Sequence, residues 1–143
     1  MLVKIKKLSP QAKEPVYGSG GAACFDLHYA GVTNAYVTPG NVSKVPTGLA
    51  FEVPKDHVML LFSRSGHGVK GVRLGNCVGV IDCDYRGEVA ALMTNDSREV
   101  MTVAPGDRIA QAMILPVQQC MFLEVDELTD TERGEGGFGS TGK

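Results

Sequence analysis

The sequence predicts an all-β fold. Short strand-like stretches recur about every eight to twelve residues, and turn residues such as Pro39-Gly40 and Pro105-Gly106 separate them. The apolar run VMLLF at residues 58–62 is typical of a strand buried on both faces. Helical periodicity is scarce, and the best helix candidate is a short one near residues 65–70. A β-sandwich or β-barrel is therefore the expected architecture.

The expected strands follow one another along the chain. In the first, residues 1–8, the alternation places Leu2, Lys4 and Lys6 on one face and Val3 and Ile5 on the other. One strand or two are expected across residues 42–45 and 48–53, and the others at residues 22–29, 36–38, 58–62, 72–74, 78–81, 89–94, 100–103, 108–117 and 120–125.

The composition is that of one globular domain: 143 residues, of which 43% are hydrophobic. The formal net charge of −2 argues against a general nucleic-acid binder, which would be basic. No apolar stretch reaches the roughly 18 residues that a membrane-spanning helix needs, and the N-terminus lacks the apolar run of a signal peptide. We therefore expect a cytoplasmic protein that binds neither nucleic acid nor membranes. The four cysteines lack C-x-x-C spacing, and we interpret them as small buried hydrophobic residues.

The C-terminal part has a different composition. Residues 124–135 hold six acidic residues and one Arg, and a glycine-rich tail follows. Such a segment buries little apolar surface, so we expect it to be disordered without a ligand. The tail contains G-x-G-x-x-G at residues 134–139, and the pattern recurs at residues 66–71. Neither copy lies between a strand and a long helix, which disfavours a dinucleotide-binding fold, and no P-loop sequence is present.

Two internal stretches contain polar residues that suit a binding or catalytic site. In SRSG, residues 63–66, Arg64 stands with two hydroxyls at a helix start, which suits either a phosphate cradle or an N-cap beside a surface Arg. In GNCVGVIDCDYRGE, residues 75–88, Asp84 fits the corner of a β-turn. Asp82 follows an apolar strand, where a carboxylate costs free energy unless it is paired or used. Gln111 is similarly unexplained within an apolar strand.

These stretches together resemble the trimeric dUTPases, the deoxyuridine triphosphate nucleotidohydrolases. Five motifs appear in the family's order: GAACFDL (21–27), SRSG (63–66), GNCVGVIDCDYRGE (75–88), GDRIAQ (106–111) and RGEGGFGSTG (133–142). They span nearly the whole chain. Small departures occur at Cys24, Phe25, Ser63 and His67, which are mostly packing positions.

The resemblance implies a jelly-roll-like β-barrel subunit in a homotrimer. It implies a catalytic domain at residues 1–126 and a flexible arm at residues 127–143 that closes a neighbouring subunit's active site. The substrate would be dUTP, hydrolysed to dUMP and pyrophosphate, which keeps uracil out of DNA and supplies dUMP for thymidylate synthesis. Apart from other copies of the chain, dUTP is the partner expected.

The resemblance also implies roles for individual residues. Asp82 would activate a water that attacks the α-phosphorus, and Tyr85 would lie under the sugar. The substrate-binding residues would be Arg64, Ser65, Gly66, Asn76, Gly79, Val80, Ile81, Asp82, Tyr85, Gln111, Arg133, Phe138, Gly139 and Ser140. Mg²⁺ would bind through the phosphates and water, with no direct protein ligand. Asp26 would contact it indirectly or be structural, for example by pairing with Arg64.

Two alternatives stay open. A deoxycytidine triphosphate deaminase shares this fold, but would need a catalytic Glu in place of the arrangement that holds Asp82 and Tyr85. A regulatory binding protein on the same scaffold would be better supported by an insertion. Only 18 residues separate Gly87 from Gly106, which leaves no room for an additional domain.

Overall fold

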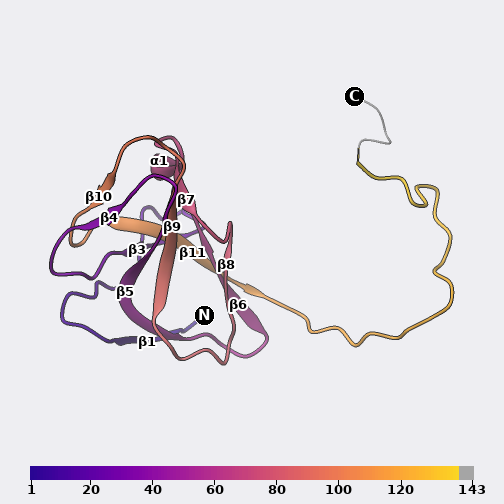
Figure 1. Cartoon of the computed structure of the whole chain (residues 1–143). Coiled ribbons are helices and arrows are strands. Elements are labelled where there is room, and N and C mark those ends of the chain that lie inside the picture. Colours follow the sequence, from indigo (N-terminus) through magenta and orange to yellow (C-terminus); the bar gives the residue numbers. More distant parts are fainter. Residues whose placement is uncertain (139–143) are drawn as a thin grey trace.

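A computed structural model describes residues 1–138 and is almost entirely β-structure (Figure 1). The elements are β1 (Lys4–Lys7), β2 (Val16–Tyr17), β3 (Phe25–His28), β4 (Ala35–Val37), β5 (Val42–Glu52), β6 (His57–Phe62), α1 (Ser65–Gly68), β7 (Val72–Leu74), β8 (Gly79–Ile81), β9 (Val89–Asn95), β10 (Met101–Val103) and β11 (Arg108–Pro116). The all-β prediction and the single short helix are confirmed. None of the helical residues described here forms a span that could cross a bilayer.

The strands form two larger antiparallel sheets and one two-stranded ribbon. The first sheet has the order β1-β5-β9-β7, and the second has the order β2-β3-β11-β6-β8. The ribbon pairs β4 with β10. Strand β6 lies between β11 and β8 and pairs with both, although these two strands are far apart in the sequence.

The hydrophobic core fills the space between the two larger sheets. Its buried side chains include, from the first sheet, Val45, Leu49, Phe51, Val89, Ala91 and Met93, and from the second, Phe25, Leu27, Met59, Leu61, Ala110 and Ala112. The run at residues 58–62 is buried on one face only. Met59 and Leu61 are in the core, whereas Val58, Leu60 and Phe62 are half-buried. The expectation of burial on both faces was therefore wrong, because this sheet is covered on only one side.

Strand β5 is one continuous strand, where the sequence left one strand or two open. A β-bulge between Pro46 and Leu49 shifts its register against β9 without ending the strand. Gly48 in the bulge has a φ of 66°, and a Cβ there would lie 2.9 Å from the Cβ atoms of both Ala12 and Ala30. A larger residue would not fit at this bend, so the glycine that looked like a strand boundary is part of the strand.

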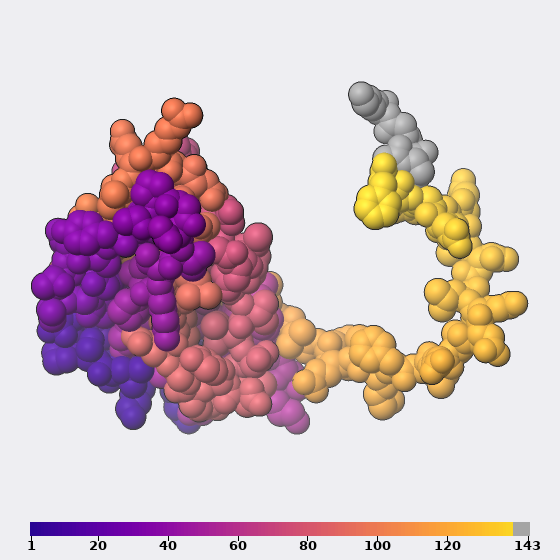
Figure 2. All heavy atoms as spheres, in the orientation of Figure 1, coloured from indigo at the N-terminus to yellow at the C-terminus, as the bar shows by residue number. Residues whose placement is uncertain are grey.

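The C-terminal segment, residues 117–138, contains neither helix nor strand and runs away from the sheets (Figures 1 and 2). The strand expected at residues 120–125 was therefore wrong. Met121 and Phe122 are 100% and 96% exposed, because no neighbouring strand of the chain lies beside them. Cys77 and Cys120 are also exposed, which corrects the prediction that all four cysteines are buried.

Asn95 is the best-satisfied buried polar residue of the fold. Its Nδ2 donates to the carbonyl oxygens of Val37 and Glu99, each at 2.7 Å. Its Oδ1 accepts from the backbone N–H of Ser97 at 2.9 Å and from the Ser97 hydroxyl at 2.7 Å. One fully buried side chain thus connects β9 to β4 and to the turn that leads into β10.

Replacing Asn95 by Ala should lower the free energy of unfolding by about 2–4 kcal/mol, because the buried Val37 carbonyl and the partly buried Glu99 carbonyl both lose their donor. Chemical denaturation at fixed protein concentration measures this. The control is Asn41→Ala, which removes two exposed hydrogen bonds and should cost no more than about 1 kcal/mol. Equal losses for both variants would contradict a central role for Asn95.

Candidate active site

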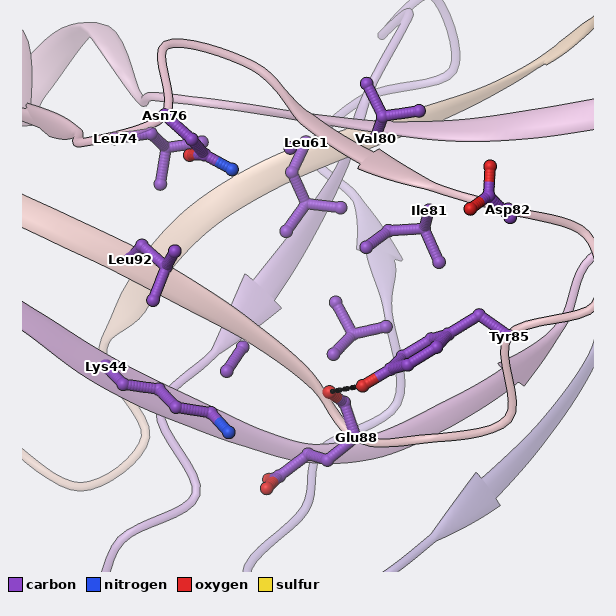
Figure 3. Close-up of a pocket in the computed structure, with 13 residues that line it drawn as sticks. Lys44, Leu61, Leu74, Asn76, Val80, Ile81, Asp82, Tyr85, Glu88 and Leu92 are labelled. Atoms are coloured by element: carbon purple, nitrogen blue, oxygen red, sulfur yellow. Dashed lines mark hydrogen bonds between the residues drawn. The ribbon is translucent and has the colours of Figure 1, made fainter.

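A pocket of about 370 Å³ lies between the segment 74–82 and the exposed faces of β5 and β9 (Figure 3). Its lining residues are Lys44, Leu61, Leu74, Asn76, Gly79, Val80, Ile81, Asp82, Tyr85, Glu88, Val89, Ala90 and Leu92. Six residues of the predicted site, from Asn76 to Tyr85, are among them. The hairpin predicted to receive a base therefore forms one wall of a real cavity.

The hairpin is held by its pairing with β6 and by a tight tip. Gly79 stands opposite Leu61, and a Cβ at Gly79 would lie 3.0 Å from the Leu61 Cβ and 3.6 Å from the Asn76 Nδ2. At the tip, Cys77 has a φ of 60°. Its N–H donates to the Leu74 carbonyl at 3.1 Å, and the Val78 N–H donates to the Asn76 carbonyl at 2.6 Å. A non-glycine residue in this conformation is strained, as is common at binding sites.

Asp82 and Tyr85 stand on the turn that follows β8. Asp82 is exposed, so the argument that it is costly to bury was wrong: β8 ends at Ile81 and the chain then turns outward. The Tyr85 hydroxyl donates to the Glu88 carbonyl at 3.1 Å, which fixes the ring along the pocket wall (Figure 3). A solvent-accessible carboxylate and a fixed aromatic ring therefore share one rim of the pocket.

The opposite wall was not predicted from the sequence. Lys44 on β5 stands directly across from Leu92 on β9, and both line the pocket. Glu88 also lines it, and its Oε1 accepts the backbone N–H of Gly48 at 2.7 Å. No local motif marks Lys44 or Leu92, because only the pairing of β5 with β9 brings them opposite the hairpin.

A second group of predicted residues surrounds Asp26. The Arg64 Nε lies 2.9 Å from the Asp26 Oδ1, and the Arg108 Nη1 lies 3.3 Å from its Oδ2. The Asp26 side chain is only 13% exposed. Each of its oxygens thus has a guanidinium partner, which fixes the direction of the Arg64 side chain.

Gln111 and α1 complete this group. The Gln111 Nε2 donates to the Ser63 carbonyl at 2.9 Å, which accounts for an amide within an otherwise apolar strand. Helix α1 begins at Ser65, and the first bonds of this turn are donated by the N–H groups of His67 and Gly68 to the Arg64 carbonyl. The N–H groups of Ser65 and Gly66 come before the first hydrogen-bonded residues of the helix, so the helix itself offers them no carbonyl acceptor. Burial lowers the pKa of His67, and the charge of Arg64 lowers it further, which favours a neutral imidazole beside Arg64.

The predicted site residues fall into three groups within one chain. The pocket holds Asn76 to Tyr85, the second group holds Arg64, Ser65, Gly66 and Gln111, and the C-terminal segment holds Arg133 and Phe138. None of the residues of the second and third groups lines the pocket. Gly139 and Ser140 lie outside the described residues. Within residues 1–138, a single chain does not bring the three groups together at the pocket.

Carboxylates that could hold a metal are sparse in the described part of the chain. Residues 1–138 contain no cluster of three or more His, Cys, Asp or Glu side chains. Both oxygens of Asp26 face arginines, and Glu88 is engaged by Gly48. Asp82 is the other carboxylate of the pocket, and its exposure suits contact with a metal through water or substrate oxygens better than a closed protein cage.

Comparison with known sequences gives a consistent result. A profile of the dUTPase family matches residues 11–142. The deoxyuridine 5'-triphosphate nucleotidohydrolase of Nautilia profundicola is 46% identical, with all of both chains covered. The enzyme of the same name from an Azoarcus species is 43% identical, covering 99% of this chain and 97% of the relative.

Solved structures agree with this result. A variant of the dUTPase of bacteriophage 80alpha superposes with a TM-score of 0.88 at 26% identity, covering 97% of this chain and 98% of that one. Another variant of the Staphylococcus bacteriophage 80alpha enzyme, solved with dUpNHpp, gives 0.86 at 26% identity, with 99% of both chains covered. These matches confirm the predicted jelly-roll-like β fold. The chain therefore belongs to the dUTPase family, and its assignment from the sequence as a dUTP diphosphatase is confirmed.

Proposed function

We propose that the chain hydrolyses dUTP to dUMP and pyrophosphate at sites shared between the subunits of a homotrimer. The observation that carries the proposal is the pocket that joins Asn76, Asp82 and Tyr85 in a member of the dUTPase family. The separation of the three groups of site residues within one chain supports sharing. The relative solved with dUpNHpp, a nucleotide that resembles dUTP, supports the substrate.

In this proposal the hairpin selects uracil. The backbone around Gly79 to Ile81, together with Asn76, would read the edge of the base. Cytosine presents the opposite pattern of donors and acceptors there, and would leave buried groups unpaired. The pairing of Gly79 with Leu61 ties the hairpin to β6 and limits how far it can move aside, which favours exclusion of a methylated base. The fixed ring of Tyr85 would lie under the sugar and exclude a 2′-hydroxyl.

Asp82 would act as the general base. Its exposed carboxylate at the rim would take a proton from a water that attacks the α-phosphorus. Arg64, Ser65, Gly66 and Gln111 of a second copy would bind the phosphates, with the guanidinium already directed by Asp26.

The C-terminal segment of a third copy would close the site. Phe138 would stack on the uracil ring, and Arg133 would contact the terminal phosphate, with Gly139 and Ser140 assisting. Mg²⁺ bound to the phosphate oxygens would neutralise charge on the triphosphate. In that role residues 127–143 are the closing arm of a catalytic domain formed by residues 1–126, in a cytoplasmic enzyme that supplies dUMP.

The substrate is tested by measuring pyrophosphate release from dUTP, dCTP, dTTP and UTP, each with and without Mg²⁺. We expect dUTP to be preferred by about 10²-fold or more, with the rate falling when Mg²⁺ is removed. Ammonia release from dCTP would instead favour a deaminase. Such a deaminase would need a catalytic Glu. Glu88 lines the pocket, but its carboxylate accepts the backbone N–H of Gly48 in this structure.

The role of Asp82 is tested by Asp82→Asn, which keeps the shape of the side chain but removes the base. It should lower kcat by about 10²- to 10⁴-fold while KM changes little. The matched control is Asp84→Asn, an exposed carboxylate on the same turn that does not line the pocket. Near-normal turnover by Asp82→Asn, or an equal loss in both variants, would remove Asp82 from this role.

The role of the tail is tested by deleting residues 133–143. The hydrogen bonds that the structure shows within residues 118–138 join residues of that segment to one another, so Tm should stay unchanged. Activity should fall by about 10²-fold or more, because the site loses its closing residues. A clear drop in Tm would show that the tail belongs to the folded body.

A further inference from the structure

Charge is divided unevenly between the body of the chain and its end. Residues 1–123 carry 12 Lys and Arg against 10 Asp and Glu. The acidic stretch, residues 124–135, carries six carboxylates against one Arg, and every one of those side chains is exposed. The ion pairs found in the described part of the chain all lie within residues 4–108, so none engages the acidic stretch.

A basic pocket of about 400 Å³ lies beside β1 and the C-terminal end of β5. It is lined by Lys4, Ile5, Lys6, Ala50, Phe51, Glu52 and Arg86. Three cations thus surround one carboxylate. The Lys4 Nζ lies 2.9 Å from the Glu52 Oε1, and this hydrogen bond lowers the pKa of Glu52, so Glu52 stays ionised and engaged. The charges of Lys6 and Arg86 are left without a carboxylate among the residues that line the pocket.

The basic pocket adjoins the candidate active site through one turn. Arg86 lines the basic pocket, and its Nη1 donates to the carbonyls of Cys83 and Tyr85 at 2.7 and 3.0 Å. Tyr85 lines the active-site pocket. A chain seated on the basic pocket would therefore lie one turn away from the substrate.

We propose that the basic pocket receives the acidic stretch of another copy of this chain, the third copy of the proposed site, and guides the residues that follow it to the active site. The inference rests on the proposed function, in which the C-terminal segment of one copy closes the site of another. The occupant is chosen by charge: an exposed, strongly acidic segment meets a cavity with an excess of two cations. Figure 2 shows the segment directed away from its own body, which favours another copy over the same chain.

Cross-linking tests the contact without requiring catalysis. Isotope-labelled and unlabelled chains are refolded together and treated with a carbodiimide, which joins a lysine amine directly to a carboxylate. We expect mixed-isotope links between Lys4 or Lys6 and carboxylates of the acidic stretch, weakened at about 1 M salt, where screening acts within roughly 3 Å. Lys55, an exposed lysine outside the basic pocket, is the control. Links to Lys55 as frequent as those to Lys6, or links only within one chain, would overturn the proposal.

Charge reversal tests its consequence for turnover. Lys6→Glu should lower kcat/KM for dUTP by roughly fivefold at low salt, and the loss should shrink at high salt, as expected for an exposed ionic contact. Lys55→Glu should have no effect. A chain with Glu124, Asp126 and Glu127 changed to Lys should also lose activity, and less so when combined with Lys6→Glu. Additive losses, or an equal effect of Lys55→Glu, would overturn the proposal.

The two experiments separate the docking surface from the reaction. Mixed-isotope links in a protein that does not hydrolyse dUTP would refute the proposed function and keep the contact. Hydrolysis of dUTP without those links would refute the contact and keep the function.

Discussion

The antiparallel pairing of β6 with both β11 and β8 is the constraint on which the site depends. On one side, β6 holds Gly79 to Ile81 in register, so the hairpin and the turn with Asp82 follow from that pairing. On the other, it holds Gln111 opposite Phe62. Where β6 ends, the chain continues directly into Ser63 and α1. Two chemically distinct groups are therefore placed by one strand, whose alternate residues Met59 and Leu61 are buried in the core.

Much of this could be predicted from the sequence, because local patterns encode it. Turn residues and short apolar runs located most strands, and the motif around Asp82 identified the pocket's hairpin. The far wall could not be predicted: Lys44 and Leu92 become neighbours only through the pairing of β5 with β9. The missing strand at residues 120–125 has a related cause. Its pattern suits a strand, but pairing requires a partner that one chain does not present.

The structure separates a folded body from a C-terminal segment whose exposed side chains are not engaged by that body. The segment exposes Met121, Phe122 and Leu123 as well as its carboxylates. Association with another chain would bury the exposed apolar side chains and would give the carboxylates cationic partners. In the proposed function, the three separated groups of predicted site residues would have the same need. Apolar contacts would supply most of the affinity, whereas charge would govern orientation and the rate of encounter.

The left-handed conformation of Cys77 affects the stability of the fold differently from the conformational range of the loop tip. A side chain at φ 60° costs about 1–2 kcal/mol, and glycine would remove that cost. Glycine also gives the unfolded chain more freedom, which offsets about 0.5–1 kcal/mol of the gain. The melting temperature of a Cys77→Gly variant would then change little, while its loop tip would sample more conformations. A strained residue at this position favours a narrow range of geometries over maximal stability.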